Sequence, residues 1–248
     1  MFVHSRATFL RFSALRESGL GARRIARELD LPLSTVRDWA AGKLPRNGWA
    51  GRCPTCGNPA HEVAELPDSY AYLLGLYLGD GCISAHPRGV FALRIVLDVA
   101  YPGIIDEALA AIEDVICAPA GRWLAPKNCV QVYGYSKSWP CLFPQHGPGK
   151  KHLRPIELED WQVDFVRRAP ELFLRGLIHS DGCRFTNQGR DGWRAPRYSF
   201  SNRSADIRRL FCDACEVLGL RWTAAPNTIY VSRKADVARM DEFIGPKV

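Results

Sequence analysis

The 248-residue sequence lacks any apolar run that approaches the ~20 residues needed for a membrane-spanning helix. Its first residues, MFVHSRATFLRFSALRESG, carry arginines among the apolar positions, which is unlike a secretory signal peptide. We therefore expect no membrane partner and a cytoplasmic protein. The nine cysteines are an odd number in a chain without an export signal, so we expect most of them to be reduced.

Acidic residues and lysines are scarce. The chain has 26 Asp and Glu against 33 Lys and Arg, and only 7 of the basic residues are lysines. The resulting net charge of +7 and the pI near 9.0 favour a polyanionic partner, although many proteins with this balance bind no nucleic acid. A hydrophobic content of 47% is ample for buried cores, and the length fits one or two domains.

Strand signals are few in residues 1–50, which we predict to be helical. The stretch ARRIARELDLPLSTVRDWAAGK places apolar residues on one face of two short helices separated by DLP, with Ser34 as the expected N-cap of the second. This pattern resembles a helix-turn-helix. Nine basic and four acidic residues give the segment a charge of +5. We predict a DNA-binding domain at 1–50 that contacts DNA through Ser34, Thr35 and Arg37; the alternative is a helical packing module without DNA.

Residues 51–69 are rich in Gly, Pro and polar side chains and are predicted to be a linker. The linker contains CPTCG, in which Cys53 and Cys56 have the spacing of half a zinc knuckle. His61 is a candidate third ligand. A second pair, Cys212 and Cys215, lies in an apolar helical run where buried cysteines usually pack. The sequence leaves two interpretations open, a structural Zn²⁺ site or two free thiols.

From residue 70 onward the chain repeats itself. YLLGLYLGDGC at 72–82 and FLRGLIHSDGC at 173–183 carry matching acidic residues, Asp80 and Asp181, which stand 101 positions apart. The same succession of strand and helix signals follows each of them. We predict two αββαββα units, at residues 70–158 and 159–248.

The repeated helices have small residues four apart, Gly75 with Gly79 and Gly176 with Ser180. Such strips permit close backbone approach, so we expect the two helices to pack on each other. Gly81 and Gly182 are expected to end them in the left-handed conformation. Asp80 and Asp181 would then lie side by side at the negative ends of two helix dipoles, where a divalent cation would offset their charge.

The strings LLGLYLGDG and LRGLIHSDG are similar to the LAGLIDADG signature, and residues 70–248 resemble the single-chain, two-repeat LAGLIDADG homing endonucleases. The resemblance implies an α+β fold whose two repeats form a pseudo-twofold saddle on double-stranded DNA, here preceded by a small all-α domain. It also implies a monomer that holds Mg²⁺ between Asp80 and Asp181 for phosphodiester hydrolysis. A basic residue is expected near each site, either Lys150 or Lys151 in the first repeat and Lys247 in the second.

Several further basic residues lie in or beside the predicted strands, where they would contact bases and phosphates or be merely solvated. His179 and Tyr77, inside the motifs, are expected to pack rather than to bind metal. The predicted DNA contacts of this group are Arg94, Lys137, Arg184, Arg197, Arg203, Arg221 and Arg233.

Three functions fit these patterns. The first is a site-specific, Mg²⁺-dependent DNA endonuclease, free-standing because no splice-junction His-Asn is present and associated with the nucleoid. The second is a transcription regulator that binds DNA without cutting it. The third is an RNA intron-splicing maturase, which the helix-turn-helix pattern disfavours. The retained pair Asp80 and Asp181 favours the endonuclease over the regulator.

Overall fold

The computed structural model describes residues 6–43, 63, 66–189, 192–245 and 247, which belong to two compact units, 1–65 and 66–248. Cys53, Cys56 and His61 lie outside the described residues, so the zinc prediction for the linker stays a prediction. Within the described ranges, no helix has both the length and the apolar character that crossing a membrane requires.

The first unit contains three helices, α1 (Arg6–Glu17), α2 (Ala22–Glu28) and α3 (Leu33–Ala40). Their core forms where the sequence pattern placed it, because Ile25, Val36 and Trp39 are buried and Phe12 meets Trp39 edge-on at 5.4 Å. The predicted N-cap is wrong. Pro32 precedes α3 and its carbonyl already accepts from the amide of Val36, so the helix begins before Ser34 and includes it.

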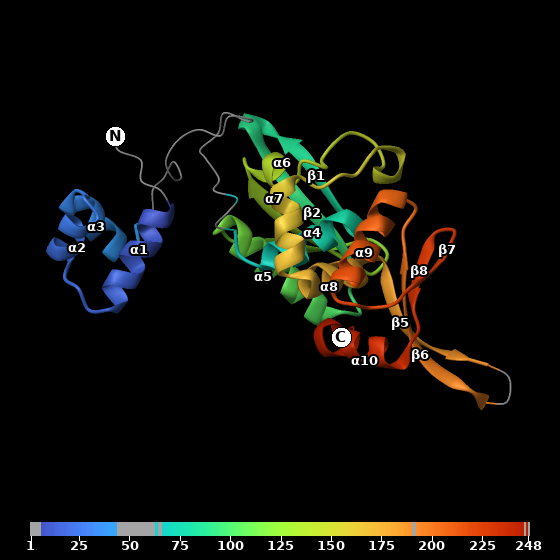
Figure 1. The fold of residues 1–248 in the computed structure, drawn as a ribbon. Helices are drawn as coiled ribbons and strands as arrows, with labels where there is room; N and C mark the ends of the chain where they lie inside the picture. The colour runs from blue at the N-terminus through green and yellow to red at the C-terminus, as the bar shows by residue number, and fades with distance from the viewer. Residues whose placement is uncertain (1–5, 44–62, 64–65, 190–191, 246, 248) are drawn as a thin grey trace. The chain divides into compact units, whose positions relative to one another are not determined.

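The second unit repeats one order of elements twice, which confirms the predicted fold class (Figure 1). A helix not predicted from the sequence, α7 (Asp160–Arg168), joins the repeats. The first repeat consists of α4 (Ser69–Asp80), β1 (Gly81–His86), β2 (Val90–Asp98), α5 (Pro102–Ile116), β3 (Gly121–Ala125), β4 (Cys129–Ser136) and α6 (Trp139–Leu142). The second consists of α8 (Pro170–Asp181), β5 (Gly182–Gln188), β6 (Arg194–Ser201), α9 (Ala205–Val217), β7 (Thr223–Ala225), β8 (Thr228–Val231) and α10 (Lys234–Ile244).

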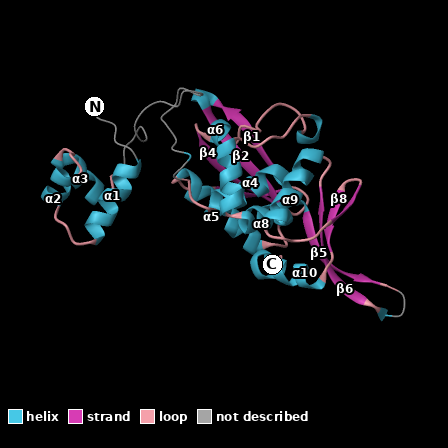
Figure 2. Cartoon of the chain, in the orientation of Figure 1, coloured by secondary structure: helices cyan, strands magenta, loops and turns pink. Residues whose placement is uncertain are grey.

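The strands, magenta in Figure 2, form two separate antiparallel sheets. The strand orders are β1-β2-β4-β3 and β5-β6-β8-β7. In each sheet one face carries the core residues that pack on helices, among them Leu93 and Ile95 in the first sheet and Tyr198 and Phe200 in the second. Because successive strand residues point to opposite faces, the intervening residues define the other face, which we call the open face of each sheet.

Helices α4 and α8 pack on each other through backbone, as the small-residue strips predicted. A Cβ atom added to Gly75 would lie 2.5 Å from the carbonyl oxygen of Phe173 and 2.9 Å from the Cα atom of Gly176. A Cβ atom on Gly176 would collide with the carbonyl of Tyr72. The backbones of α4 and α8 are therefore closer here than any side chain would allow, and the ends of the two helices are fixed relative to each other.

The glycines that follow these helices are not in the left-handed conformation, so that prediction is wrong. Gly81 has φ −85° and Gly182 has φ −108°, both extended. Glycine is needed because the chain turns at once into a strand, and a Cβ atom would lie 2.5 Å from Cα of Tyr77 or of Ile178. Each aspartate therefore sits at a direct helix-to-strand junction.

The substitution Gly176→Ala is expected to destabilise the second unit by about 3 kcal/mol, because the added methyl group meets backbone atoms that cannot rotate away. The measurement is chemical denaturation of the full chain. Gly147→Ala is the matched control, since its Cβ atom would meet only the Arg154 side chain, at 3.4 Å. Equal stability losses in both variants would contradict the close-packing interpretation.

Candidate metal and nucleic-acid site

The structure brings together the two repeated aspartates. Asp80 is the last residue of α4 and Asp181 the last of α8. Asp181 accepts a hydrogen bond of 2.6 Å from Nδ2 of Asn202. Removal from bulk water, and then the negative charge of Asp181, raise the pKa of Asp80 to about 6, although its side chain still reaches solvent. Burial also raises the pKa of Asp181. Both carboxylates are therefore costly to ionise.

Two lysines partly offset this cost. Lys151 donates to the last carbonyls of α4, those of Tyr77, Leu78 (3.1 Å) and Gly79 (3.0 Å). Lys247 donates to the carbonyl of Gly182, just after α8, at 2.5 Å. Their positive charges lower the pKa of Asp80, while burial lowers the pKa of Lys151 to about 8. Of the two first-repeat candidates, Lys151 is thus the one that contacts the helix end.

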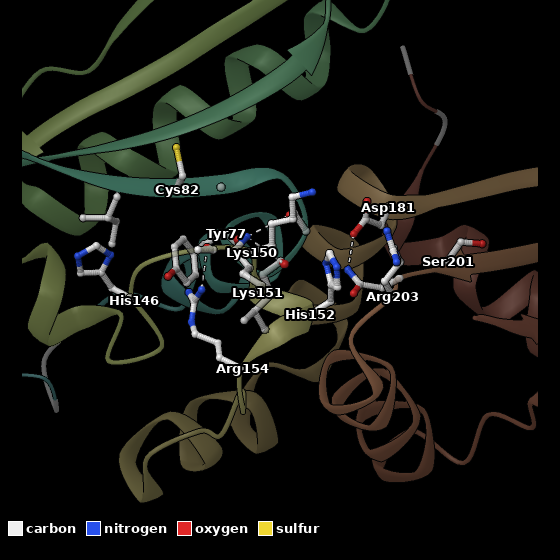
Figure 3. A pocket seen from close by; sticks show the side chains of 17 residues that line it. Tyr77, Cys82, His146, Lys150, Lys151, His152, Arg154, Asp181, Ser201 and Arg203 are labelled. Carbon is white, nitrogen blue, oxygen red and sulfur yellow. Dashed lines mark hydrogen bonds between the residues drawn. The ribbon is translucent and has the colours of Figure 1, made fainter. Parts of the chain in front are cut away.

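A cavity of about 450 Å³ opens beside the helix ends (Figure 3). The loop that follows α6 contributes several nitrogen-bearing side chains to it, and Asp181, Asn202 and Arg203 contribute from the second repeat. Lys150 lines this cavity and is exposed, so its charge is available to an anion there. The basic and imidazole side chains in the lining are His146, Lys150, Lys151, His152, Arg154 and Arg203.

The donor atoms at the helix ends suit a hard divalent cation. Both side chains offer carboxylate oxygen, and Mg²⁺ is commonly held by one or two carboxylates together with water and substrate phosphate. Among the described residues no group of three or more His, Cys, Asp or Glu side chains is placed to hold a metal. Asp80 and Asp181 would therefore hold the ion only in part, which leaves its other positions to water and phosphate.

Among the described residues, Cys212 and Cys215 belong to no group of three or more His, Cys, Asp or Glu side chains that could hold a metal. Both are buried within α9, and burial raises the pKa of Cys212 to about 11 and that of Cys215 further. A thiol that stays protonated is a poor zinc ligand. These two residues pack, as the apolar run around them indicated.

The strand register assigns the predicted sheet contacts to faces. Arg94 pairs with Cys82 on one side and Tyr133 on the other, and these three lie on the open face of the first sheet. Arg197 lies on the open face of the second sheet, 5.6 Å from the centre of the Tyr230 ring. Among the described residues, no hydrogen-bond partner reaches the buried Nε of Arg197. Both arginines therefore lie on the open faces of the two sheets.

Arg184 differs from these two. It pairs across the strands with the buried Tyr198, so it lies on the helix-covered face. There it forms a two-bond ion pair with Asp241 of α10, at 2.7 and 2.9 Å. The strand run CRFT gave no sign of this, because the face of Arg184 depends on a register that only the folded sheet fixes. Arg184 is therefore not part of the open face of the second sheet.

The remaining predicted contacts lie outside the strands. Lys137 and Arg203 are exposed, the first just after β4 and the second just after β6. Arg233 precedes α10 and is exposed. Arg221 lies 3.7 Å from Asp236, so part of its charge is paired.

No protein-family model matches the sequence, and no curated protein sequence matches it. Solved structures do match. The homing endonuclease I-DmoI in complex with DNA and Mn is 14% identical, with 75% of this chain and 100% of that chain covered at a TM-score of 0.48. The LAGLIDADG meganuclease I-AabMI bound to uncleaved DNA is 12% identical, with 70% and 82% covered at 0.45. The structural neighbours of the present chain are LAGLIDADG proteins.

A third match is the N-terminal LAGLIDADG domain of DUF199/WhiA, 14% identical, with 74% of this chain and 88% of that chain covered at a TM-score of 0.44. At such identities a likeness concerns the fold alone. The LAGLIDADG-like helices α4 and α8 were already expected from the two motifs. The fold alone does not determine what the chain does with them.

Two motif residues behave as expected for packing positions of the LAGLIDADG-like helices. His179 is buried and contacts the hydroxyl of Tyr72 at 3.0 Å. Tyr77 is buried against the ring of Phe143, with ring centres 4.6 Å apart. Neither side chain is placed as a metal ligand.

In the first unit the predicted contacts share α3. Ser34 and Arg37 are exposed and Thr35 is half-buried, while the apolar face of the helix is turned into the core. This arrangement leaves the polar face available to a partner. It does not identify that partner, so DNA contact by this unit stays a prediction.

Sequence reasoning missed an aromatic group on the open face of the first sheet. Tyr133 and Tyr135 meet with ring centres 5.6 Å apart, His86 meets Tyr135 at 5.2 Å, and Trp123 is 48% exposed on the same face. Alternation in CVQVYGYS gave a signal that Tyr133 and Tyr135 share a face. It could not say which face the helices cover. Exposed aromatic rings on a sheet suit contact with bases.

The raised pKa of Asp80 predicts a pH-dependent stability difference in metal-free buffer. Because the folded protein binds this proton more tightly than the unfolded chain, the contribution of Asp80 to wild-type stability is lost as the pH rises from about 4 to about 6. The variant Asp80→Asn lacks this loss. Its melting temperature should therefore match wild type below pH 4 and exceed it above pH 6. A difference that does not change with pH would contradict the assignment.

Proposed function

We propose that this protein is a site-specific double-stranded DNA endonuclease that hydrolyses phosphodiesters with a divalent cation, Mg²⁺ in the cell. The observation that carries the proposal is the pair Asp80 and Asp181, brought together at two helix ends and flanked by Lys151 and Lys247. A pair of acids with raised pKa values beside basic groups is typical of a site for charged chemistry. The similarity of the chain to DNA-bound LAGLIDADG structures supports this reading.

A metal ion between the carboxylates would lower the pKa of a bound water and neutralise the leaving oxygen. The chain's own residues supply the rest. Lys151 and Lys247 place positive charge where charge develops on the phosphate. Lys150 and Arg203 line the adjoining cavity and attract the strand. Arg94, Arg197 and the aromatic group around Tyr133 then fix the register of the duplex on the two open faces.

The first unit is proposed to add a second DNA contact through the exposed face of α3. Deleting residues 1–50 should weaken duplex binding and flatten its dependence on salt, because each phosphate contact contributes a slope of about 0.9 in log K against log[salt]. The measurement is fluorescence anisotropy between low and moderate salt. Arg37→Gln, which removes one charge, should reduce the slope by about one. An unchanged slope after the deletion would rule out DNA contact by this unit.

A transcription regulator that binds DNA without cutting is the second candidate. The observation that favours it is that the two lysines already offset part of the carboxylate charge, so the pair can persist in the fold without metal. A regulator would also use the α3 face and the two open sheet faces.

One experiment separates these functions. Sequences bound by the full chain are selected from a random duplex pool, and the selected duplexes are then incubated with the protein and Mg²⁺. The proposed function predicts cleavage at one position on each strand. Binding without cleavage, in Mg²⁺ and in Mn²⁺, would favour the regulator.

A further inference from the structure

Lys247 reaches the site from a short segment beyond α10. The helix ends at Ile244, Gly245 follows with φ +68°, and Lys247 donates to Gly182 two residues later. A lysine on an unrestrained backbone would lose much entropy on being held at one carbonyl. Contacts that fix the end of α10 reduce this cost.

Arg175 makes such contacts. It lies on α8 and donates through Nη1 to the carbonyls of Phe243, at 2.6 Å, and Ile244. Its other nitrogens are held by Glu107 of α5, with Nε to Oε1 at 2.6 Å and Nη2 to Oε2 at 2.8 Å. Both partners are largely withdrawn from solvent, with side chains 25% and 30% exposed. The guanidinium is thus fixed by the first repeat while it holds the end of the last helix of the second.

His179, one turn further along α8, holds the same point. Its Nε2 lies 3.2 Å from the carbonyl oxygen of Ile244 and its Nδ1 lies 3.0 Å from the hydroxyl of Tyr72. Because a carbonyl only accepts, Nε2 carries the proton and Nδ1 accepts from Tyr72. Burial lowers the pKa of His179 to about 4, so the ring is neutral at pH 7. The carbonyl of Ile244 is therefore held by two side chains of one helix.

We propose that Arg175, oriented by Glu107 and helped by His179, is a positioning residue for Lys247. It couples the α5 helix of the first repeat to the lysine that serves the second. The positioning itself is independent of the function proposed above, and only its effect on DNA cleavage rests on that function.

Lys151 is held in a different way, which provides an internal control. Arg154, from the same loop as Lys151, donates to the carbonyls of Gln145 at 2.8 Å and Gly149 at 3.0 Å. None of these groups contacts Arg175 or Glu107 in the described structure. Loosening the α10 end should leave Lys151 in place.

The test is competitive labelling of lysine amines in the full-length, metal-free protein, with the rate at each lysine read by mass spectrometry. In Arg175→Gln, Lys247 should be labelled about tenfold faster than in wild type, while Lys151 is unchanged. Arg184→Gln is the matched control, because it removes a two-bond ion pair to α10 without touching the carbonyls of Phe243 and Ile244. It should leave the Lys247 rate unchanged.

Glu107→Gln is the second variant, in case Arg175→Gln does not fold. It keeps the shape, removes the charge that fixes Arg175, and should raise the Lys247 rate by a few-fold. Melting curves identify any variant that has unfolded. An unchanged Lys247 rate in a folded Arg175→Gln protein, or an equal rise at Lys151, would overturn the proposal.

A second readout is the rate of cleavage of each strand of a selected duplex. Because Lys151 and Lys247 belong to different repeats, Arg175→Gln should slow one strand by about tenfold and leave the other nearly unchanged. A purely structural role would slow both strands equally and overturns the catalytic part of the proposal. If wild type cuts neither strand, the nuclease function fails, while the labelling result still decides whether Arg175 positions Lys247.

Discussion

Asp80→Asn and Asp181→Asn are each expected to lower DNA cleavage by at least about a thousandfold, the scale on which the loss of a group stabilising the transition state acts. The asparagine keeps the shape of the side chain but removes the charge that a divalent cation needs. Duplex binding should persist or improve, because a negative charge near the phosphates is lost. The measurement is cleavage of the selected duplex in Mg²⁺ at equal occupancy.

The same variants can be tested without any DNA. Since only the native site brings the two carboxylates together, Mg²⁺ should raise the melting temperature of wild type and not that of the double variant. Arg184→Gln is a suitable control, because it changes a charge of the same repeat on the helix-covered face. Equal cleavage by wild type and the double variant would remove the catalytic role from both aspartates. Equal stabilisation by Mg²⁺ would remove their role as ligands.

Lys151→Met is expected to reduce cleavage by about a hundredfold while it strengthens Mg²⁺ binding. The lysine places charge near the reacting phosphate, and a group of this kind contributes roughly 10²–10³ to the rate. The same charge repels a cation bound by Asp80 and Asp181, so its removal favours the metal. This opposition between rate and affinity distinguishes a lysine that acts in the site from one that only supports the fold.

The readouts are cleavage under saturating Mg²⁺ and the Mg²⁺ concentration that gives half of the thermal stabilisation. Metal-free Lys151→Met should also melt below wild type, because three carbonyls at the end of α4 lose their donor. For the melting comparison alone, Lys150→Met is the control, since Lys150 is exposed and Lys151 is the lysine that donates to these carbonyls. A Lys151→Met protein that cleaves DNA more slowly and also binds Mg²⁺ more weakly would indicate a structural role for Lys151.

The parts of the fold that the sequence predicted correctly are those set by local pattern. Two copies of a nine-residue motif gave the two repeats, and the spacing of Gly75, Gly79, Gly176 and Ser180 gave the close helix pair. Each signal lies within a short stretch of the chain, either one motif or two small residues four positions apart.

The wrong predictions concern features that tertiary structure sets and local sequence does not. Gly81 was expected to be left-handed, because a glycine after a helix usually is, yet the chain there enters a strand directly. Arg184 was expected to face DNA, yet pairing with Asp241 holds it on the other side. No pattern in the sequence indicated a role for Arg175, because the carbonyls to which it donates are 68 and 69 residues away. Long-range partners of this kind leave no periodic trace in a sequence.

The backbone contact between Gly75 and Gly176 has a consequence for how such a protein can change. The distance between α4 and α8, which end in Asp80 and Asp181, is set where main chain meets main chain. Side chains on the open faces can therefore be exchanged without altering that distance. A lineage of such proteins could acquire new target sequences by drift on its sheets, while the four small residues between the helices stay under strict selection.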